Sequence, residues 1–272
     1  MSTPRPIERL LLLGDDYGIP ELLAHVPRER VVGIVATANR PQYHATLAAL
    51  AAEAGLPLLI QPPAQETEAA AQFITQLAAL APDGLLCHSY AMLVRPPMLA
   101  LVDGHAFNVH AALLPRHRGP NPVQWALIHG DTHTGITLHQ MSEGFDSGAI
   151  LAQQQVPITP EDTWVTLHAR IREQTPALLQ RALPGLLSGH WHATAQDERL
   201  ALHNPRITRD SFRLDASMSD RAIYNLIRAQ VAPLAGAYAD TPQGRIRFPD
   251  FVPLHDIPAL RTRLQTTSTH AH

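Results

Sequence analysis

Residues 9–36 read RLLLLGDDYGIPELLAHVPRERVVGIVA, and this stretch decides the class of fold. Its two short apolar runs, at 9–14 and 31–36, have the length of buried strands. Between them, PELLAHV at 20–26 predicts a short helix. A strand, a helix and a second strand in this order predict two parallel strands joined by a crossover helix.

The same alternation continues to residue 110. Helices are expected at 43–54, 66–81 and 96–101, and strands at 56–62, 83–87 and in GHAFNVHAALLP at 104–115. Strands that alternate with helices indicate an α/β fold with a mostly parallel sheet. In such a sheet, ligands bind at the carboxyl ends of the strands.

After residue 110 the pattern changes. We expect half-buried strands at 135–141 and 149–158, a long amphipathic helix at 163–187, a helix at 217–230 and a hairpin within 236–254. The chain therefore divides into a large α/β domain at 1–202, a small, partly barrel-like α+β subdomain at 203–263, and a flexible tail at 264–272.

Composition narrows the class of function. Hydrophobic residues make up 45% of the 272 residues and charged residues 17%, which is typical of a globular protein with a sizeable core. The formal net charge is −3 and no basic run occurs, which argues against a nucleic-acid partner. A single cysteine, Cys87, favours a reducing compartment. We find no leader pattern and no apolar run of about 20 residues, so we expect a cytoplasmic protein without a membrane partner.

Asn108 and His110 are the first candidate catalytic residues. They stand two apart on an expected strand, so both side chains point to one face where the strand enters a loop. An amide N–H and an imidazole can address one carbonyl oxygen, and acyl transfer needs both an oxyanion donor and a proton carrier. The alternative is a pair of polar residues that cap the strand end.

Asp146 is the third candidate. It lies in GFDSG, a Gly-flanked turn that can return a carboxylate to the edge of the sheet. A carboxylate beside an imidazole stabilises the charged form of the ring. An ordinary turn aspartate is the alternative interpretation.

The stretch 107–151, FNVHAALLPRHRGPNPVQWALIHGDTHTGITLHQMSEGFDSGAIL, contains these residues in a longer pattern. It has N-x-H, L-L-P-x-x-R-G, T-G-x-T and D-x-G in order, and in this it resembles the folate-dependent formyltransferases, the superfamily of methionyl-tRNA formyltransferase. The resemblance covers about 8–190 and continues more weakly to 237. Within the superfamily, the sequence most resembles the nucleotide-sugar N-formyltransferases, such as UDP-4-amino-4-deoxy-L-arabinose formyltransferase.

This resemblance implies a Rossmann-like formyltransferase domain and a role for each residue. Asn108 would donate to the formyl oxygen, His110 would carry the proton, and Asp146 would orient His110. The donor would be 10-formyltetrahydrofolate, and no metal would be needed. The residues implied to contact the folate are Met92, Leu93, Val94, Leu113, Leu114, Pro115, Ser142, Glu143, Gly144 and Phe145.

The acceptor is the less determined part of the resemblance. Ala112 and Ala216 stand where many relatives have Ser and an aromatic residue, and Leu234-Ala235 replaces an aromatic-Pro pair. We expect a small-molecule amine, foremost that of a nucleotide-linked amino sugar, and allow for a homodimer. The alternatives are another amine (an amino acid, a siderophore precursor or methionyl-tRNA), a deformylase, or a folate- or nucleotide-binding protein without catalysis.

Three other features of the sequence have simple interpretations. The 16 histidines include His129 and His133 at helical spacing, but no recognisable metal-ligand set accompanies them. The LGDDYG loop at 13–18 is interpreted as the first strand-to-helix loop, since no G-x-G-x-x-G is present. Asn225 and Arg228 are either a helix-surface pair or a docking contact.

Overall fold

A computed structural model describes residues 4–241 and 244–268 of the chain. The chain forms two compact units that alternate along the sequence. The first unit takes residues up to 110, 136–154 and 175–198, and the second takes 111–135, 155–174 and the residues from 199 onward. The predicted domains at 1–202 and 203–263 remain a prediction.

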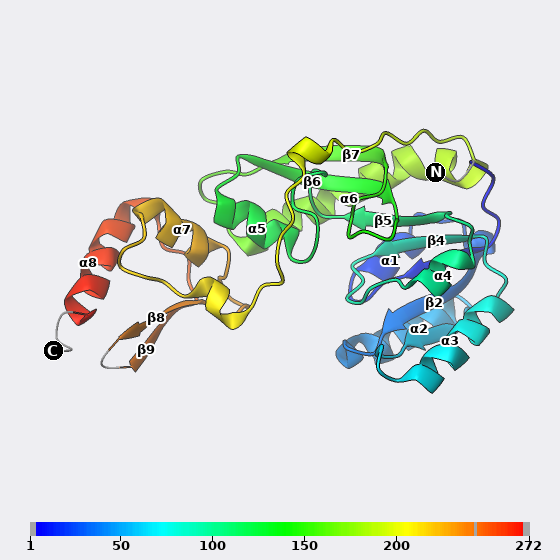
Figure 1. Cartoon of the computed structure of the whole chain (residues 1–272), viewed down its shortest axis with the longest axis horizontal. Helices are drawn as coiled ribbons and strands as arrows, with labels where there is room; N and C mark the ends of the chain where they lie inside the picture. Colours follow the sequence, from blue (N-terminus) through cyan, green and yellow to red (C-terminus); the bar gives the residue numbers. More distant parts are fainter. Residues whose placement is uncertain (1–3, 242–243, 269–272) are drawn as a thin grey trace. The chain divides into compact units, whose positions relative to one another are not determined.

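A seven-stranded sheet forms the centre of the first unit (Figure 1). Its order is β3-β2-β1-β4-β5-β6-β7, and all pairs from β3 to β5 are parallel, whereas β5 and β6 are antiparallel. The bounds are β1 Leu10–Leu13, β2 Val31–Thr37, β3 Leu58–Gln61, β4 Gly84–His88, β5 Ala106–His110, β6 His133–Gln140 and β7 Ile150–Pro157. The predicted α/β fold with a mostly parallel sheet is confirmed.

Continuous apolar runs become the central strands because both faces of a parallel sheet are covered. All four residues of β1 are fully buried. The connecting helices are α1 Gly18–Leu23, α2 His44–Glu53, α3 Thr67–Ala79 and α4 Pro96–Ala100. Helix α1 packs on β1 and β4, and α2 packs on β2 and β3. Helix α2 thus covers the two strands that it connects, whereas α1 covers β1 and its neighbour β4.

The first strand-to-helix loop is held close to β4 by two glycines. A Cβ atom at Gly14 would lie 2.6 Å from the His88 carbonyl oxygen, and one at Gly18 would lie 2.0 Å from it. Any side chain there would collide with backbone, so close packing explains both glycines. Buried Asp15 accepts hydrogen bonds from the Thr37 amide at 2.9 Å and the Ala91 amide at 3.1 Å. The carboxyl ends of β1 and β2 are thereby tied to the loop that follows β4.

The remaining helices are α5 Pro122–His129, α6 Trp164–Ser188, α7 Asp220–Arg228 and α8 Ile257–Ser268, and a hairpin forms from β8 Ala237–Thr241 and β9 Gly244–Phe248. The short 3₁₀ helices are η1 Arg28–Arg30, η2 Pro41–Tyr43, η3 Glu198–Leu200, η4 Arg209–Phe212 and η5 Leu254–Asp256. The predicted hairpin is confirmed. Helices α5 and α8 were not predicted.

Helix α7 packs against α5 within the second unit. The Asn225 amide nitrogen donates to the Ile128 carbonyl oxygen at 3.3 Å, and the Arg228 Nε donates to Asn225 Oδ1 at 3.0 Å. Both side chains are buried, so the docking interpretation of this pair is the correct one. Residues 264–268 of the tail predicted at 264–272 form the last turn of α8, and 269–272 lie outside the described residues, so the flexible tail stays a prediction.

Candidate active site

Strand β5 carries the first two candidate residues at its carboxyl end. Asn108 is half-buried and His110 is buried, and Val109 between them points into the core. The alternation follows from the pleat, which sends residues two apart to one face. As predicted from N-x-H, the amide and the imidazole share a face where β5 ends.

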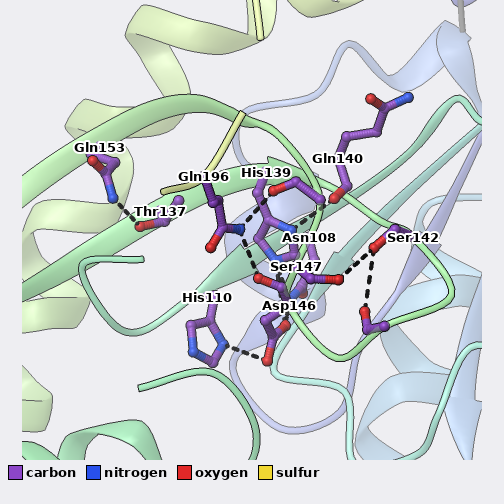
Figure 2. Close-up of polar contacts among 12 residues, drawn as sticks. Asn108, His110, Thr137, His139, Gln140, Ser142, Asp146, Ser147, Gln153 and Gln196 are labelled. Carbon is purple, nitrogen blue, oxygen red and sulfur yellow. Dashed lines mark hydrogen bonds and ion pairs between the residues drawn. The ribbon is translucent and has the colours of Figure 1, made fainter. Parts of the chain in front are cut away.

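Asp146 lies in the turn between β6 and β7 and brings its carboxylate to both of these side chains (Figure 2). Its Oδ2 is 3.6 Å from His110 Nδ1, and its Oδ1 accepts from the Asn108 amide nitrogen at 3.3 Å. The Asp146 side chain is 16% exposed and that of His110 is 8% exposed. The structure thus brings all three predicted catalytic side chains together in a largely water-excluded place.

A second histidine, His139, completes the cluster and was not among the sequence candidates. Its Nε2 is 3.2 Å from the Asn108 amide nitrogen and 3.4 Å from Asp146 Oδ1. Its Nδ1 donates to the Gln140 carbonyl oxygen at 2.8 Å, which leaves Nε2 of the neutral ring as an acceptor for Asn108. His139 pairs directly with Asn108 in the β5–β6 register. The signal in the sequence was the final residue of TGITLH.

The turn that carries Asp146 is fixed by a side chain from a distant segment. The Gln196 amide nitrogen donates to the Asp146 carbonyl oxygen at 2.8 Å and to the Gly148 carbonyl oxygen at 2.7 Å (Figure 2). Asp146 itself has a left-handed backbone, with a φ of 50°. The hydrogen bonds from Gln196 to the backbone of the turn therefore fix the position of the Asp146 carboxylate. No motif marks Gln196 in the sequence.

Two of the three predicted folate-contacting segments lie in the same unit as this cluster. Met92, Leu93 and Val94 follow β4, where Val94 is buried and Leu93 is 52% exposed. The second segment, Ser142, Glu143, Gly144 and Phe145, precedes Asp146, and Phe145 is 61% exposed. Large apolar side chains left exposed beside a polar site are a surface that a flat ring could cover.

The third predicted segment, Leu113, Leu114 and Pro115, belongs to the second unit. Leu114 is buried there, and the Pro115 carbonyl oxygen accepts from the Leu202 amide at 3.1 Å. This loop is thus held by backbone bonding within the second unit. Its predicted contact with folate stays a prediction.

Cys87 lies on β4 next to the cluster and is buried, as predicted. Burial, helped by the negative charges of Asp146 and Asp15, raises the pKa of its thiol far above the ordinary value. A thiol that stays protonated is a poor nucleophile. Cys87 is therefore not a candidate nucleophile, and the polar side chains gathered beside it are Asn108, His110, His139 and Asp146.

Residues 4–241 and 244–268 hold no group of three or more His, Cys, Asp or Glu side chains placed to bind a metal ion. Within the same ranges, no helix is long and apolar enough to cross a bilayer.

Comparison with known proteins places this geometry in context. Residues 24–183 match the formyl transferase family. A sugar N-formyltransferase from Shewanella sp. FDAARGOS_354 is similar over 90% of this chain and 97% of its own, at 19% identity and a TM-score of 0.71. An N-formyltransferase from Helicobacter canadensis, in complex with folinic acid and dTDP-3-aminofucose, is similar over 82% and 80%, at 17% identity and a TM-score of 0.63. Glycinamide ribonucleotide transformylase 1 from Symbiobacterium toebii is similar over 70% and 95%, at 26% identity and a TM-score of 0.57.

Proposed function

Because the chain belongs to the formyl transferase family, we propose that it transfers the formyl group of 10-formyltetrahydrofolate to a primary amine of a nucleotide-linked amino sugar. The observation that carries the proposal is the meeting of Asn108, His110 and Asp146 at the end of β5. Direct acyl transfer to an amine needs an oxyanion donor and a proton carrier, and a neighbouring carboxylate stabilises the charged form of an imidazole carrier.

Asn108 is the oxyanion donor in this proposal. Its amide N–H groups contact Asp146 Oδ1 at 3.3 Å and His139 Nε2 at 3.2 Å, beyond the usual N–H···O optimum near 2.9 Å. Long bonds are weak, so one N–H can turn to the formyl oxygen as negative charge develops on it. A preorganised donor of this kind contributes about 3–4 kcal/mol to the barrier reduction.

His110 is the proton carrier. The amine nitrogen bonds to the formyl carbon and loses a proton to the imidazole, and the same proton is then delivered to the folate nitrogen as its bond to the formyl carbon breaks. Asp146 Oδ2, 3.6 Å from His110 Nδ1, stabilises the ring while it carries the charge. Atoms balance without a covalent enzyme intermediate, and the donor leaves as tetrahydrofolate.

The donor assignment is supported by the residues around the cluster. Leu93 and Phe145 expose apolar surface in the two segments that flank it, which suits a flat heteroaromatic ring. The similar Helicobacter canadensis protein was crystallised with folinic acid, a formylated folate, and with a dTDP-linked amino sugar. These two observations together favour a folate donor and a nucleotide-linked acceptor.

The test is to incubate the protein with 10-formyltetrahydrofolate and a panel of amines, and to measure release of tetrahydrofolate. The panel contains dTDP- and UDP-linked amino sugars, free amino acids and methionyl-tRNA. We expect release only with an amino sugar nucleotide. Release with water alone would indicate a hydrolase. Release only with another amine would identify that amine as the acceptor in place of the amino sugar. No release with any amine would indicate a binding protein without catalysis.

A further inference from the structure

A cavity of about 170 Å³ opens in the first unit among the end of β3, helix α3 and helix α4. Its apolar wall is made by Ala70, Phe73, Ile74 and Met98. None of Asn108, His110, His139 or Asp146 lines it. The cavity is therefore a separate feature from the candidate active site.

One charged group borders this apolar wall. The Arg95 Nη2 donates to the Pro62 carbonyl oxygen at 3.0 Å. No carboxylate in 4–241 or 244–268 forms an ion pair with Arg95, and a guanidinium keeps its charge at every ordinary pH. The cavity thus combines apolar surface with a positive charge that has spare donors and no counter-ion from the described chain.

The other polar side chain on the cavity is already engaged. Gln61 is 2% exposed, and its amide nitrogen donates to the Leu93 carbonyl oxygen at 3.0 Å while its Oε1 accepts from the Tyr90 hydroxyl. Its acceptor and one of its two N–H donors have partners, so Arg95 is the charged group with which an anionic ligand bonds. An occupant needs one anionic head and a compact apolar body.

The volume of the cavity limits the size of the apolar part of the ligand. A protein cavity of about 150 Å³ lined by Leu, Ile and Phe accepts benzene. We propose that this cavity binds a small aromatic monocarboxylate, with its ring against Phe73, Ile74 and Met98 and its carboxylate on Arg95. Nucleotides and folates are far larger than the cavity, and a cation would meet the Arg95 charge. Gln61 lines the cavity and also donates to the Leu93 carbonyl oxygen, so such a ligand would contact a residue that holds the 92–94 segment in place.

Benzoate is the probe for the test, with binding to the full-length protein measured by titration calorimetry. We expect Arg95→Gln to weaken benzoate binding roughly tenfold or more, because a charge-assisted hydrogen bond is lost. Ala70→Leu should abolish binding by filling the cavity. Neutral benzamide should bind about tenfold more weakly than benzoate to the native protein, for the same reason as the Arg95 variant.

Two matched variants serve as controls, and both should bind benzoate like the native protein. Arg40→Gln removes another half-buried arginine without a carboxylate partner among the described residues, and Ala78→Leu enlarges an exposed alanine of α3 outside the cavity. Melting curves for every variant establish that loss of binding is not loss of fold.

Three results would overturn the proposal. The first is no benzoate binding to the native protein, and the second is equal binding to native protein and the Arg95 variant. The third is displacement of benzoate by saturating folinic acid, since that would make the cavity part of the donor site. Unchanged benzoate binding in the presence of folinic acid supports a separate site, whatever the formyl acceptor proves to be.

Discussion

Asp146 contacts both other proposed catalytic side chains, so its charge is the most sensitive single feature of the site. Asp146→Asn keeps the shape of the side chain and removes the carboxylate that faces His110 at 3.6 Å. We expect formyl transfer to fall roughly a hundredfold or more, with the pH–rate profile moved, because the charged imidazole loses its partner.

Steady-state rates measured across pH test this expectation, and thermal melting establishes that the variant folds. Asp103→Asn is the control, because Asp103 is exposed, belongs to the same unit and also has a left-handed backbone. A rate for Asp146→Asn close to that of the control would remove Asp146 from the mechanism.

His139 offers a test in which two substitutions separate the two ring nitrogens. His139→Asn retains a donor near Nδ1, which bonds the Gln140 carbonyl, whereas His139→Gln retains a polar group near Nε2, which faces Asn108 and Asp146. We expect the Asn variant to lose about tenfold in kcat and the Gln variant to lose less, since one positioning hydrogen bond contributes about 1 kcal/mol. Equal rates for the native protein and both variants would show that His139 does not position the site.

The residues of the site differ in how well the sequence predicts them. Asn108, His110 and Asp146 are found because their types and motifs match one reaction. His139 could be identified only from the β5–β6 register, which places it opposite Asn108. A sequence does not reveal the register of two strands joined by a long connection. Gln196 needs tertiary packing, because it bonds the backbone of Asp146 across 50 residues.

At the scale of elements, the connection between β6 and β7 carries the site and tolerates little change. A Cβ atom at Gly148 would lie 1.8 Å from the Gln140 carbonyl oxygen, so Gly148→Ala must displace backbone. We expect it to lower the free energy of unfolding by about 1–3 kcal/mol, the usual range for overpacking.

Urea denaturation measures this loss. Gly33→Ala is the comparison, since its new Cβ would meet the flexible end of Leu80 at 2.8 Å and not backbone. A loss for Gly148→Ala no larger than that for Gly33→Ala would argue against a tightly fixed turn.

Helix α6 begins beside a buried carboxylate whose charge stabilises the second unit. Burial alone would raise the pKa of Asp162, but hydrogen bonds from Arg170, the Thr159 amide and Thr166 outweigh it and lower this pKa. A carboxyl with a depressed folded-state pKa stabilises the protein above its unfolded pKa, near 3.9, and the contribution is lost as pH falls through the folded value.

We therefore expect Asp162→Asn to lower the free energy of unfolding by about 1–3 kcal/mol at pH 7, because Arg170 loses its buried, charged hydrogen-bond partner. The cost should shrink as pH falls below 4. Urea denaturation at several pH values measures it. A cost that does not change with pH would mean that shape, and not charge, is what Asp162 contributes.

The elements were predictable where the sequence pattern has one physical cause. Runs such as RLLLLG become strands because a parallel sheet buries both faces, and glycines mark the loops. Helix α5 was missed because it lies inside a motif-rich stretch and has apolar residues all round. Helix α8 was missed because its polar sequence resembles a tail.

At the scale of the whole molecule, the topology explains why the site is where it is. Strands β1, β4 and β5 run parallel, so their following loops gather at one edge, and antiparallel β6 returns His139 beside Asn108. Motifs that lie far apart in the sequence thus meet in one spatial cluster. Membership of the family supports formyl transfer. The proposed catalytic roles rest on that cluster, and the proposed acceptor rests on segments that differ from those of many relatives.

The most direct measurement follows the formyl carbon itself. The protein is given 10-formyltetrahydrofolate labelled with ¹³C in the formyl group and a dTDP-linked amino sugar labelled with ¹⁵N in the amine, and the products are observed by NMR. We predict a ¹³C–¹⁵N coupled formamide that the native protein forms and the Asp146→Asn variant does not. Label recovered as formate, or an amino sugar left unformylated while donor is consumed, would contradict the account.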